Sequence, residues 1–278
     1  MCALRSRPFP VALTPEELRF LRTVADDTED APWMSMNDAQ WRNATALYWS
    51  LQTYAREHPV PWFPGGMLPL TYRVPGVAAR KQVAPDVFVA TVPVEGRSSL
   101  PADEEGMPPF VLEVVSSSSA QRDLEEKTEI YRLLGVQEYA IVRLDLREPR
   151  LEGYHLGVTG SWDVWPTDEQ GRLWSSVLGL WLALVDGEVR ALMRLGELLP
   201  TPAEERTARR QAEAARLQAE AARQQAEEAR RQAEVARLRE AEARLQAEAA
   251  RQQAEEEVAR LRAMLDRLMR GGDETPAS

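Results

Sequence analysis

Hydrophobic positions recur at helical spacing in two segments near the start of the chain. The first follows Thr14-Pro15-Glu16-Glu17, which is a capping box with proline at the first helical position. The second covers residues 37–56, where apolar side chains recur three and four positions apart until His58-Pro59. We therefore predict an N-terminal arm with one helix, residues 1–35, and a longer helix at the start of the next domain.

Short apolar runs bounded by proline and glycine follow, and they predict strands at residues 70–74, 85–92 and 110–115. Residues 138–144 are typical of a buried strand, and residues 151–156 and 161–165 of a closing antiparallel pair. A helix between them is predicted from the capping pair Ser118 and Gln121 to the C-cap Gly135. This order predicts an α/β domain over residues 36–200, with a mixed β-sheet flanked by helices and with the apolar segment 173–197 completing its core.

From residue 203 the pattern becomes a repeat of seven residues, beginning RQAEAAR-LQAEAAR-QQAEEAR at Arg210. Alanine recurs at alternating spacings of three and four, which is a coiled-coil seam made of the smallest apolar residue. Near its end the seam moves to larger side chains, at Val258, Leu261, Leu265 and Leu268. We predict a long helix over residues 203–270 that forms a homo-oligomer, although its alanine-rich middle also suits a solvated single rod. A disordered tail, residues 271–278, is expected to follow.

The composition limits where the protein works. The single cysteine, Cys2, permits no internal disulfide, and the longest apolar run, residues 178–185, is too short to span a bilayer. The first ten residues contain two arginines but no apolar signal region. We therefore expect a soluble, cytoplasmic protein without a membrane segment.

The charge pattern bears on a nucleic-acid partner. The formal net charge is −10, and the first 202 residues have 19 basic and 28 acidic side chains. That excess counts against a domain that binds DNA by releasing counterions, but it suits acidic side chains gathered around a cation. Of the 34 basic residues just two are lysines, Lys81 and Lys127. A lysine kept in such a chain can mark a place where a guanidinium does not serve, whereas the simpler expectation is two lysines left on the surface by chance.

Most catalytic signatures are missing from the sequence. It has no phosphate-binding glycine loop, no G-x-S-x-G elbow and no paired cysteines, and neither His58 nor His155 has the spacing of a metal ligand. The serine run 116–119 could supply a nucleophile, but serines before a helix more commonly form its turn and cap. The candidates that remain are acidic.

Glu113 lies inside the apolar strand VLEVV, where an unpaired carboxylate would cost several kcal/mol, so it needs a partner or a metal. Asp86 opens the preceding strand. The next helix carries Asp123 and Lys127 four residues apart and hence on one face. If that face packs beside the strand, two carboxylates and an ammonium could hold Mg²⁺ and orient a water for phosphodiester attack. The alternative is a structural ion pair between Glu113 and Lys127 or Arg132.

Pro85-Asp86-Val87, followed by PPFVLEVVSSSSAQRDLEEKTEIYRLLGVQEYAIV at residues 108–142, resembles the putative restriction endonuclease family. This family is a divergent, bacterially abundant branch of the PD-(D/E)xK nucleases. The segment RLWSSVLGLWLALVDGEVRAL, the following TPAEE and the terminal coiled coil resemble one subgroup of it. The resemblance covers residues 37–200 and implies a restriction-endonuclease-like fold.

The resemblance also implies roles for residues of this chain. Asp86 and Glu113 would bind Mg²⁺ or Mn²⁺ together with the backbone carbonyl of Val114. The family's usual lysine position, two residues after the glutamate, is Val115 here, so the strand motif is broken, and Lys127 of the following helix would replace it.

Three further residues would have supporting roles under the same resemblance. Asp123 would be a supporting acid, and Ser116 a turn residue beside the metal. The acidic and histidine-bearing pattern that the family often shows at its first helix is poorly matched by WMSMNDAQWRN, where Asp38 is the available stand-in.

Three functions are therefore open at this point. The first is a Mg²⁺- or Mn²⁺-dependent endonuclease that hydrolyses DNA. The second is a catalytically inactive nuclease fold that binds or assembles through its coiled coil. The third is a metal-dependent hydrolase of RNA or another phosphodiester.

Overall fold

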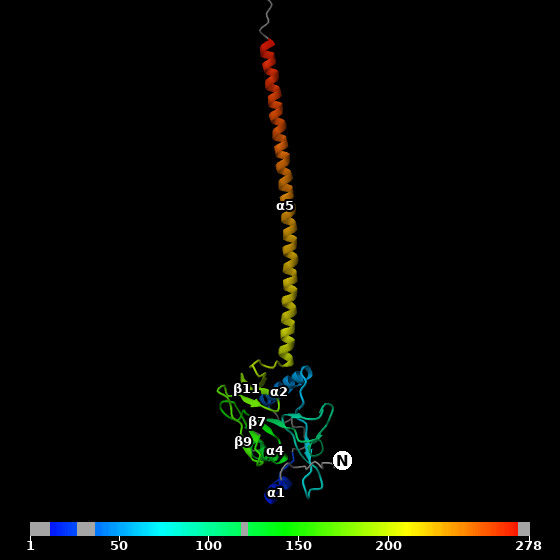
Figure 1. Ribbon diagram of the computed structural model, residues 1–278, viewed down its shortest axis with the longest axis vertical. Helices are drawn as coiled ribbons and strands as arrows, with labels where there is room; N and C mark the ends of the chain where they lie inside the picture. Colours follow the sequence, from blue (N-terminus) through cyan, green and yellow to red (C-terminus); the bar gives the residue numbers. More distant parts are fainter. Residues whose placement is uncertain (1–11, 27–36, 118–121, 272–278) are drawn as a thin grey trace, which may run out of the picture. The chain divides into compact units, whose positions relative to one another are not determined.

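The computed structural model describes residues 12–26, 37–117 and 122–271. The chain separates into two compact units, Met1–Thr207 and Ala208–Ser278 (Figure 1). The predicted capping pair of Ser118 and Gln121, the tail after residue 271 and parts of the N-terminal arm lie outside the described residues.

Both N-terminal helices form where the sequence predicts them. Helix α1 (Pro15–Thr23) begins with the expected capping box, in which Glu17 N donates to Thr14 Oγ1 and Thr14 N donates to Glu17 Oε2. Helix α2 (Asp38–Glu57) has a second capping box, between Asn37 and Gln40. These reciprocal bonds satisfy backbone donors that the first turn of a helix otherwise leaves without a partner.

The first unit is built on a six-stranded mixed sheet in the order β1-β4-β6-β7-β8-β9. Strands β6 and β7 are parallel, and every other neighbouring pair in this sheet is antiparallel. This sheet confirms the α/β class, and β8 and β9 confirm the predicted closing pair. The strand bounds are β1 (Phe63–Gly65), β4 (Val87–Ala90), β6 (Phe110–Val115), β7 (Glu138–Arg143), β8 (Arg150–Leu156) and β9 (Trp162–Val164).

Two small sheets complete the unit. One has the order β3-β2-β5, and the other is the antiparallel meander β10-β11-β12, which forms from the apolar segment that was expected to complete the core. Their bounds, with the short helix α3, are β2 (Leu70–Tyr72), β3 (Lys81–Val83), β5 (Leu100–Pro101), α3 (Ala102–Glu105), β10 (Leu173–Ser175), β11 (Leu180–Val185) and β12 (Glu188–Leu192).

Strand β6 separates two hydrophobic cores because its side chains alternate between the faces of the sheet. Val111 and Val115 belong to the core that also contains the buried residues of helix α4 (Thr128–Leu134). Leu112 and Val114 belong to the core that contains the buried face of α2 and the meander. Glu113 is therefore directed toward the α4 side of the sheet.

The helix after β6 starts as a π-helical segment, η2 (Arg122–Lys127), and continues as α4. Gly135 ends α4 in the left-handed region at φ 84°, as the predicted C-cap requires. A π-helical segment turns more slowly than an α-helix and is found frequently at functional sites. Here it ends at Lys127.

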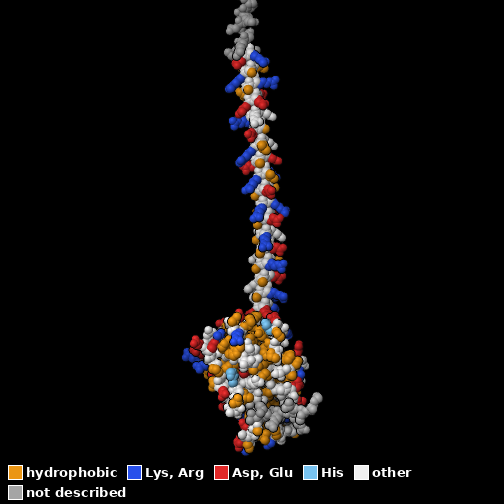
Figure 2. All heavy atoms as spheres, viewed as in Figure 1, with side chains coloured by type: hydrophobic (Ala, Val, Ile, Leu, Met, Phe, Trp, Pro, Cys, Tyr) orange, Lys and Arg blue, Asp and Glu red, His pale blue; other side chains and the backbone are white. Residues whose placement is uncertain are grey.

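The second unit is the heptad part of helix α5 (Pro202–Gly271), which confirms the predicted long helix. Residues 208–267 are all exposed in the single chain. Acidic and basic side chains alternate along the helix (Figure 2), and pairs four residues apart form ion pairs, as between Arg231 and Glu227 and between Arg244 and Glu240. Among the described residues, none of the helices has the length and apolar character needed to cross a membrane.

Candidate active site

Glu113 is buried in the middle of the first unit, with 1% of its side chain exposed. Its Oε1 atom lies 3.1 Å from the ammonium of Lys127 and accepts a hydrogen bond of 2.6 Å from the hydroxyl of Tyr131. Lys127 ends η2 and Tyr131 lies one turn later in α4, so a single helix face supplies both partners. The cost of burying the carboxylate is thus offset by a charged and a neutral donor.

Lys127 is itself buried, with 9% of its side chain exposed. Its ammonium also donates to the backbone carbonyl of Ala84 at 3.1 Å, and so links the helix to the segment that precedes β4. The second lysine, Lys81, is buried too and donates to the carbonyl of Val24 at 2.6 Å. The expectation of two surface lysines is therefore wrong, because each ammonium reaches a buried backbone carbonyl.

Asp86 lies opposite Glu113, because the antiparallel register of β4 and β6 pairs their neighbours Val87 and Leu112. Its Oδ2 accepts a hydrogen bond of 2.6 Å from the backbone N–H of Val114. The carbonyl of Val114 accepts a hydrogen bond of 2.8 Å from the side-chain amide of Gln40, in the first turn of α2. Asp86 and the backbone of Val114 therefore meet where β4 begins and β6 nears its end, with Glu113 at the register position opposite Asp86.

A model of the Uma2 family, described as putative restriction endonucleases, matches residues 32–185. The chain belongs to the Uma2 family. The match covers more than half of the sequence and both strands that carry the acids, so the resemblance in the sequence is confirmed. No curated protein matches the chain.

The resemblance also gave supporting roles to three other residues, which differ in their surroundings. Ser116 is buried directly after β6. Asp38 is on the surface of α2, with 82% of its side chain exposed and an ion pair to Arg42 at 3.2 Å. The side chain of Asp123 lies outside the described part of this Uma2 chain.

The alternative partner for Glu113 was Arg132, and the structure directs Arg132 elsewhere. Its guanidinium bonds the carboxylates of Glu129 and Glu17 and the carbonyl of Gly160. Hydrogen bonds from Arg132 to Glu129 and then to Glu17 raise the arginine pKa further above its ordinary value. Arg132 therefore holds α1, α4 and the turn after β8 together, and Lys127 is the cation at Glu113.

Sequence reasoning missed two residues of this site, Tyr131 and Gln40. Tyr131 follows Lys127 by four positions, so the spacing that joined Asp123 to Lys127 also places it on the same face. Gln40 carries a weaker signal, because its position in a capping box already explains a polar side chain there. Its reach to Val114, 74 residues away, depends on how α2 crosses the sheet.

The oxygen donors at Asp86, Glu113 and Val114 are of a kind that suits a divalent cation. Asp86 and Glu113 supply carboxylate oxygens and Val114 supplies a carbonyl oxygen, all of them hard ligands suited to Mg²⁺ or Mn²⁺. In the part of the chain that the structure describes, no three His, Cys, Asp or Glu side chains gather to hold a metal. A cation bound here would therefore take its remaining ligands from water and substrate, as Mg²⁺ commonly does.

A second buried glutamate, Glu138, has an entirely different environment. It starts β7, is 2% exposed, and accepts hydrogen bonds from the hydroxyls of Ser175 and Ser176, both 2.5 Å long. The N–H groups of Ser176 and Val177 donate to it as well. Glu138 thus joins the central sheet to the meander.

Proposed function

We propose that this Uma2 chain is a Mg²⁺- or Mn²⁺-dependent endonuclease that hydrolyses phosphodiester bonds in DNA. The observation that supports it most directly is the buried contact of 3.1 Å between the Lys127 ammonium and the Glu113 carboxylate. The next residue after Glu113, Val114, donates its backbone N–H to Asp86. A cytoplasmic location belongs to the same proposal, because DNA is found there and the one cysteine permits no internal disulfide.

In this proposal Asp86, Glu113 and the carbonyl of Val114 would hold the cation. When bound, the cation supplies Lewis acidity toward the scissile phosphate and lowers the pKa of water. Gln40 keeps the Val114 carbonyl in place, and Tyr131 fixes the orientation of Glu113. Lys127 places a positive charge at the carboxylates, where its ammonium can orient the attacking water and balance the charge that develops on phosphate.

The test is nicking of supercoiled plasmid by the full-length chain with Mg²⁺ or Mn²⁺. Glu113→Ala and Lys127→Ala should each lower the nicking rate by at least about a hundredfold. Lys127→Arg should lower it too, because a guanidinium is wider than an ammonium and keeps its proton. Asp163→Ala, at an exposed position of β9, is the control and should nick normally. Nicking that persists in both site variants would remove the assignment of the site.

The ion pair between Lys127 and Glu113 also supports a second candidate, a catalytically inactive nuclease fold that acts as a binding or assembly module. A buried carboxylate with two donors is complete as a structural pair and needs no metal. Titration calorimetry separates the two candidates, since a retired site should release no heat on addition of Mn²⁺. A hydrolase of RNA would instead be recognised by RNA that competes with plasmid.

We further propose that α5 makes the chain a homo-oligomer. Its larger apolar side chains, including Val258, Leu261 and Leu265, are exposed in the single chain at coiled-coil spacing. A chain that ends after Thr207 should be a folded monomer, whereas the full-length chain should have a multiple of its own mass in light scattering. Ending at Thr207 keeps the ion pair between Glu204 and Arg190. A monomeric full-length chain contradicts the proposal.

A further inference from the structure

A hollow of about 390 Å³ lies next to the segment that carries Asp86. Its walls come from α2, from β1 with Gly66 directly after it, and from the loop after β4. Gly66 lines the hollow, and the N–H of the next residue, Met67, donates to the carbonyls of Pro85 and Asp86 at 3.1 and 3.3 Å. These hydrogen bonds connect the wall of the hollow to the segment that carries Asp86.

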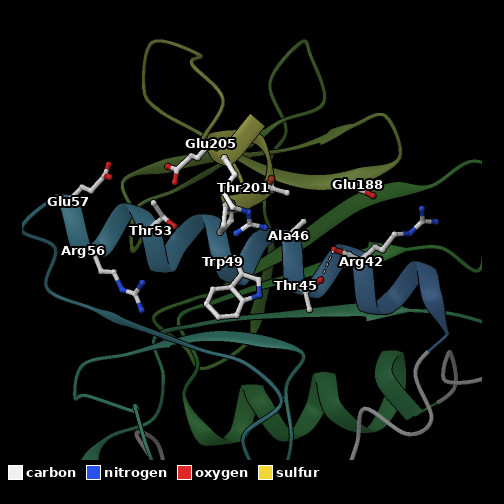
Figure 3. Close-up of a pocket in the computed structure, with 13 residues that line it drawn as sticks. Arg42, Thr45, Ala46, Trp49, Thr53, Arg56, Glu57, Glu188, Thr201 and Glu205 are labelled. Atoms are coloured by element: carbon white, nitrogen blue, oxygen red, sulfur yellow. Dashed lines mark hydrogen bonds between the residues drawn. The ribbon is translucent and has the colours of Figure 1, made fainter. Parts of the chain in front are cut away.

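Two aromatic rings of the hollow remain exposed to solvent. Trp49 of α2 is 45% exposed and Phe63 of β1 is 39% exposed. Trp49 also lines a neighbouring hollow of about 770 Å³, and Figure 3 shows Trp49 and Arg56 projecting from α2 there. Flat apolar faces left in water beside a cationic side chain are the surfaces on which nucleobases stack.

The charge of the hollow differs from that of the chain as a whole. Arg56 and Arg97 line it against the single acid Glu95, in a protein of net charge −10. Arg97 is held by Glu105 at 2.7 Å, whereas Arg56 has no ion-pair partner among the described residues. Burial raises the pKa of Tyr48, with Arg56 lowering it and Glu95 raising it, so both charges act on the same wall. Arg56 is thus the cation available to a phosphate.

An amide in the same wall has an acceptor that the described chain does not use. The Oε1 atom of Gln52 is buried, and no donor within the described residues reaches it. Gln52 stands between Trp49 and Arg56 on α2. This oxygen has no contact with solvent, so a ligand in the hollow would reach it only if the side chain of Gln52 moved.

We infer that this hollow binds a single-stranded segment of nucleic acid beside the cleavage site, with one base stacked on Trp49 and a phosphate held by Arg56. The volume lies within the usual range of small-ligand sites, about 300–1,000 Å³, and is enough for a base with its sugar. A duplex keeps its bases stacked on one another, so an unpaired segment is what the exposed ring can take. The inference rests on the proposed nuclease function for its purpose, but its test requires no cleavage.

The probe is a fluorescein-labelled 12-mer of thymidylate, titrated with the full-length chain in EDTA and followed by anisotropy. Trp49→Ala should weaken binding about tenfold, the loss of one base–aromatic stack, and Trp49→Phe should restore most of it. Arg56→Gln should lower the slope of log affinity against log salt by about 0.7, which is the loss of one phosphate contact on a single strand. A 12-base-pair duplex should bind equally to wild type and Trp49→Ala.

Trp41→Ala is the matched control, because Trp41 is 46% exposed on the same helix and lines neither hollow. It should bind the 12-mer as wild type does. Equal binding by Trp49→Ala and Trp41→Ala overturns the inference, as does a change of oligomeric mass in Trp49→Ala, which would make the hollow an interface between copies. If binding of the 12-mer depends on Trp49 but the chain does not nick plasmid, the single-strand site is supported and the proposed nuclease activity is contradicted. Nicking that depends on Glu113, with no effect of Trp49 on the 12-mer, does the reverse.

Discussion

Glu113 and Glu138 are both buried glutamates on the two parallel strands of one sheet, yet their surroundings differ in kind. Glu138 is at the start of β7, opposite Phe110, and it is held by hydroxyl and backbone donors. Glu113 is near the end of β6, on the other face, and it is held by an ammonium and a phenol. The donors to Glu138 are uncharged hydroxyl and N–H groups, and together they hold β7 to the meander. The ion pair of Glu113 with Lys127 stands near the carboxyl ends of the two parallel strands, at the edge where ligands bind in α/β sheets.

The largest expected effect comes from a change at Glu138, which holds β7 to the meander, rather than at a residue of the proposed active site. Glu138→Ala should lower the free energy of unfolding by about 3 kcal/mol, because the donors of Ser175, Ser176 and Val177 lose a buried acceptor. Urea denaturation measures this loss, and the fraction that stays folded should nick plasmid at the wild-type rate. A folded Glu138→Ala chain with no activity would mean that the two glutamates do not have separate roles.

The next largest effect is stabilisation by a divalent metal, which should depend on Glu113 and not on Glu138. Mn²⁺ at a hundred times its dissociation constant should stabilise the wild type by about 2.7 kcal/mol, since it binds the folded chain alone. Glu113→Gln should lose this stabilisation, and Glu138→Gln, matched in chemistry and burial, should keep it. Thermal denaturation with and without Mn²⁺ gives both values. Equal stabilisation in the two variants would place the ion away from Glu113.

The smallest effect concerns a third carboxylate, Glu204, which is about half exposed and pairs with Arg190 at 2.7 Å. Hydrogen bonding from Arg190 lowers the pKa of Glu204 from 4.5 to about 2. A depressed carboxyl pKa stabilises the fold above the unfolded value, so this contribution is complete above pH 4.5 and is lost as the pH falls toward 2. Solvent screening keeps it under about 1 kcal/mol. Glu204→Gln should differ most from wild type in urea denaturation at pH 7, and the difference should shrink as the pH falls below 4.5 and disappear only toward pH 2. A difference that does not change with pH would contradict the pairing.

The local elements of the fold could be predicted because their signals lie within a few residues of one another. The capping box at Thr14, the αL glycine at Gly135 and the heptads of α5 each appear where the sequence places them. The same is true of part of the candidate site. Glu113 requires a partner because it lies in an apolar strand. Lys127 could be predicted as that partner because it lies on the next helix, four residues after Asp123 and on the same helix face.

Other residues could not be predicted because their partners are remote in sequence. Glu138 begins its strand, where a glutamate looks like an ordinary surface residue, and its donors come 37 to 39 residues later. Gln40 reaches Val114 across 74 residues. Lys81 looked like a surface lysine until the fold brought the carbonyl of Val24 to it.

The sequence by itself therefore determined many of the elements, the long C-terminal helix and the need for a charged partner at Glu113, since propensity, periodicity and the cost of a buried charge act locally. The packing of the sheet decided which cation pairs with Glu113. Arg132 binds Glu17 and Glu129, and Lys127 contacts Glu113. The packing also decided that an exposed tryptophan and an arginine would face a hollow whose wall is connected to the segment that carries Asp86. The physical reason is that a side chain's partner is set by how elements cross in space, and those crossings depend on the whole core rather than on any one segment.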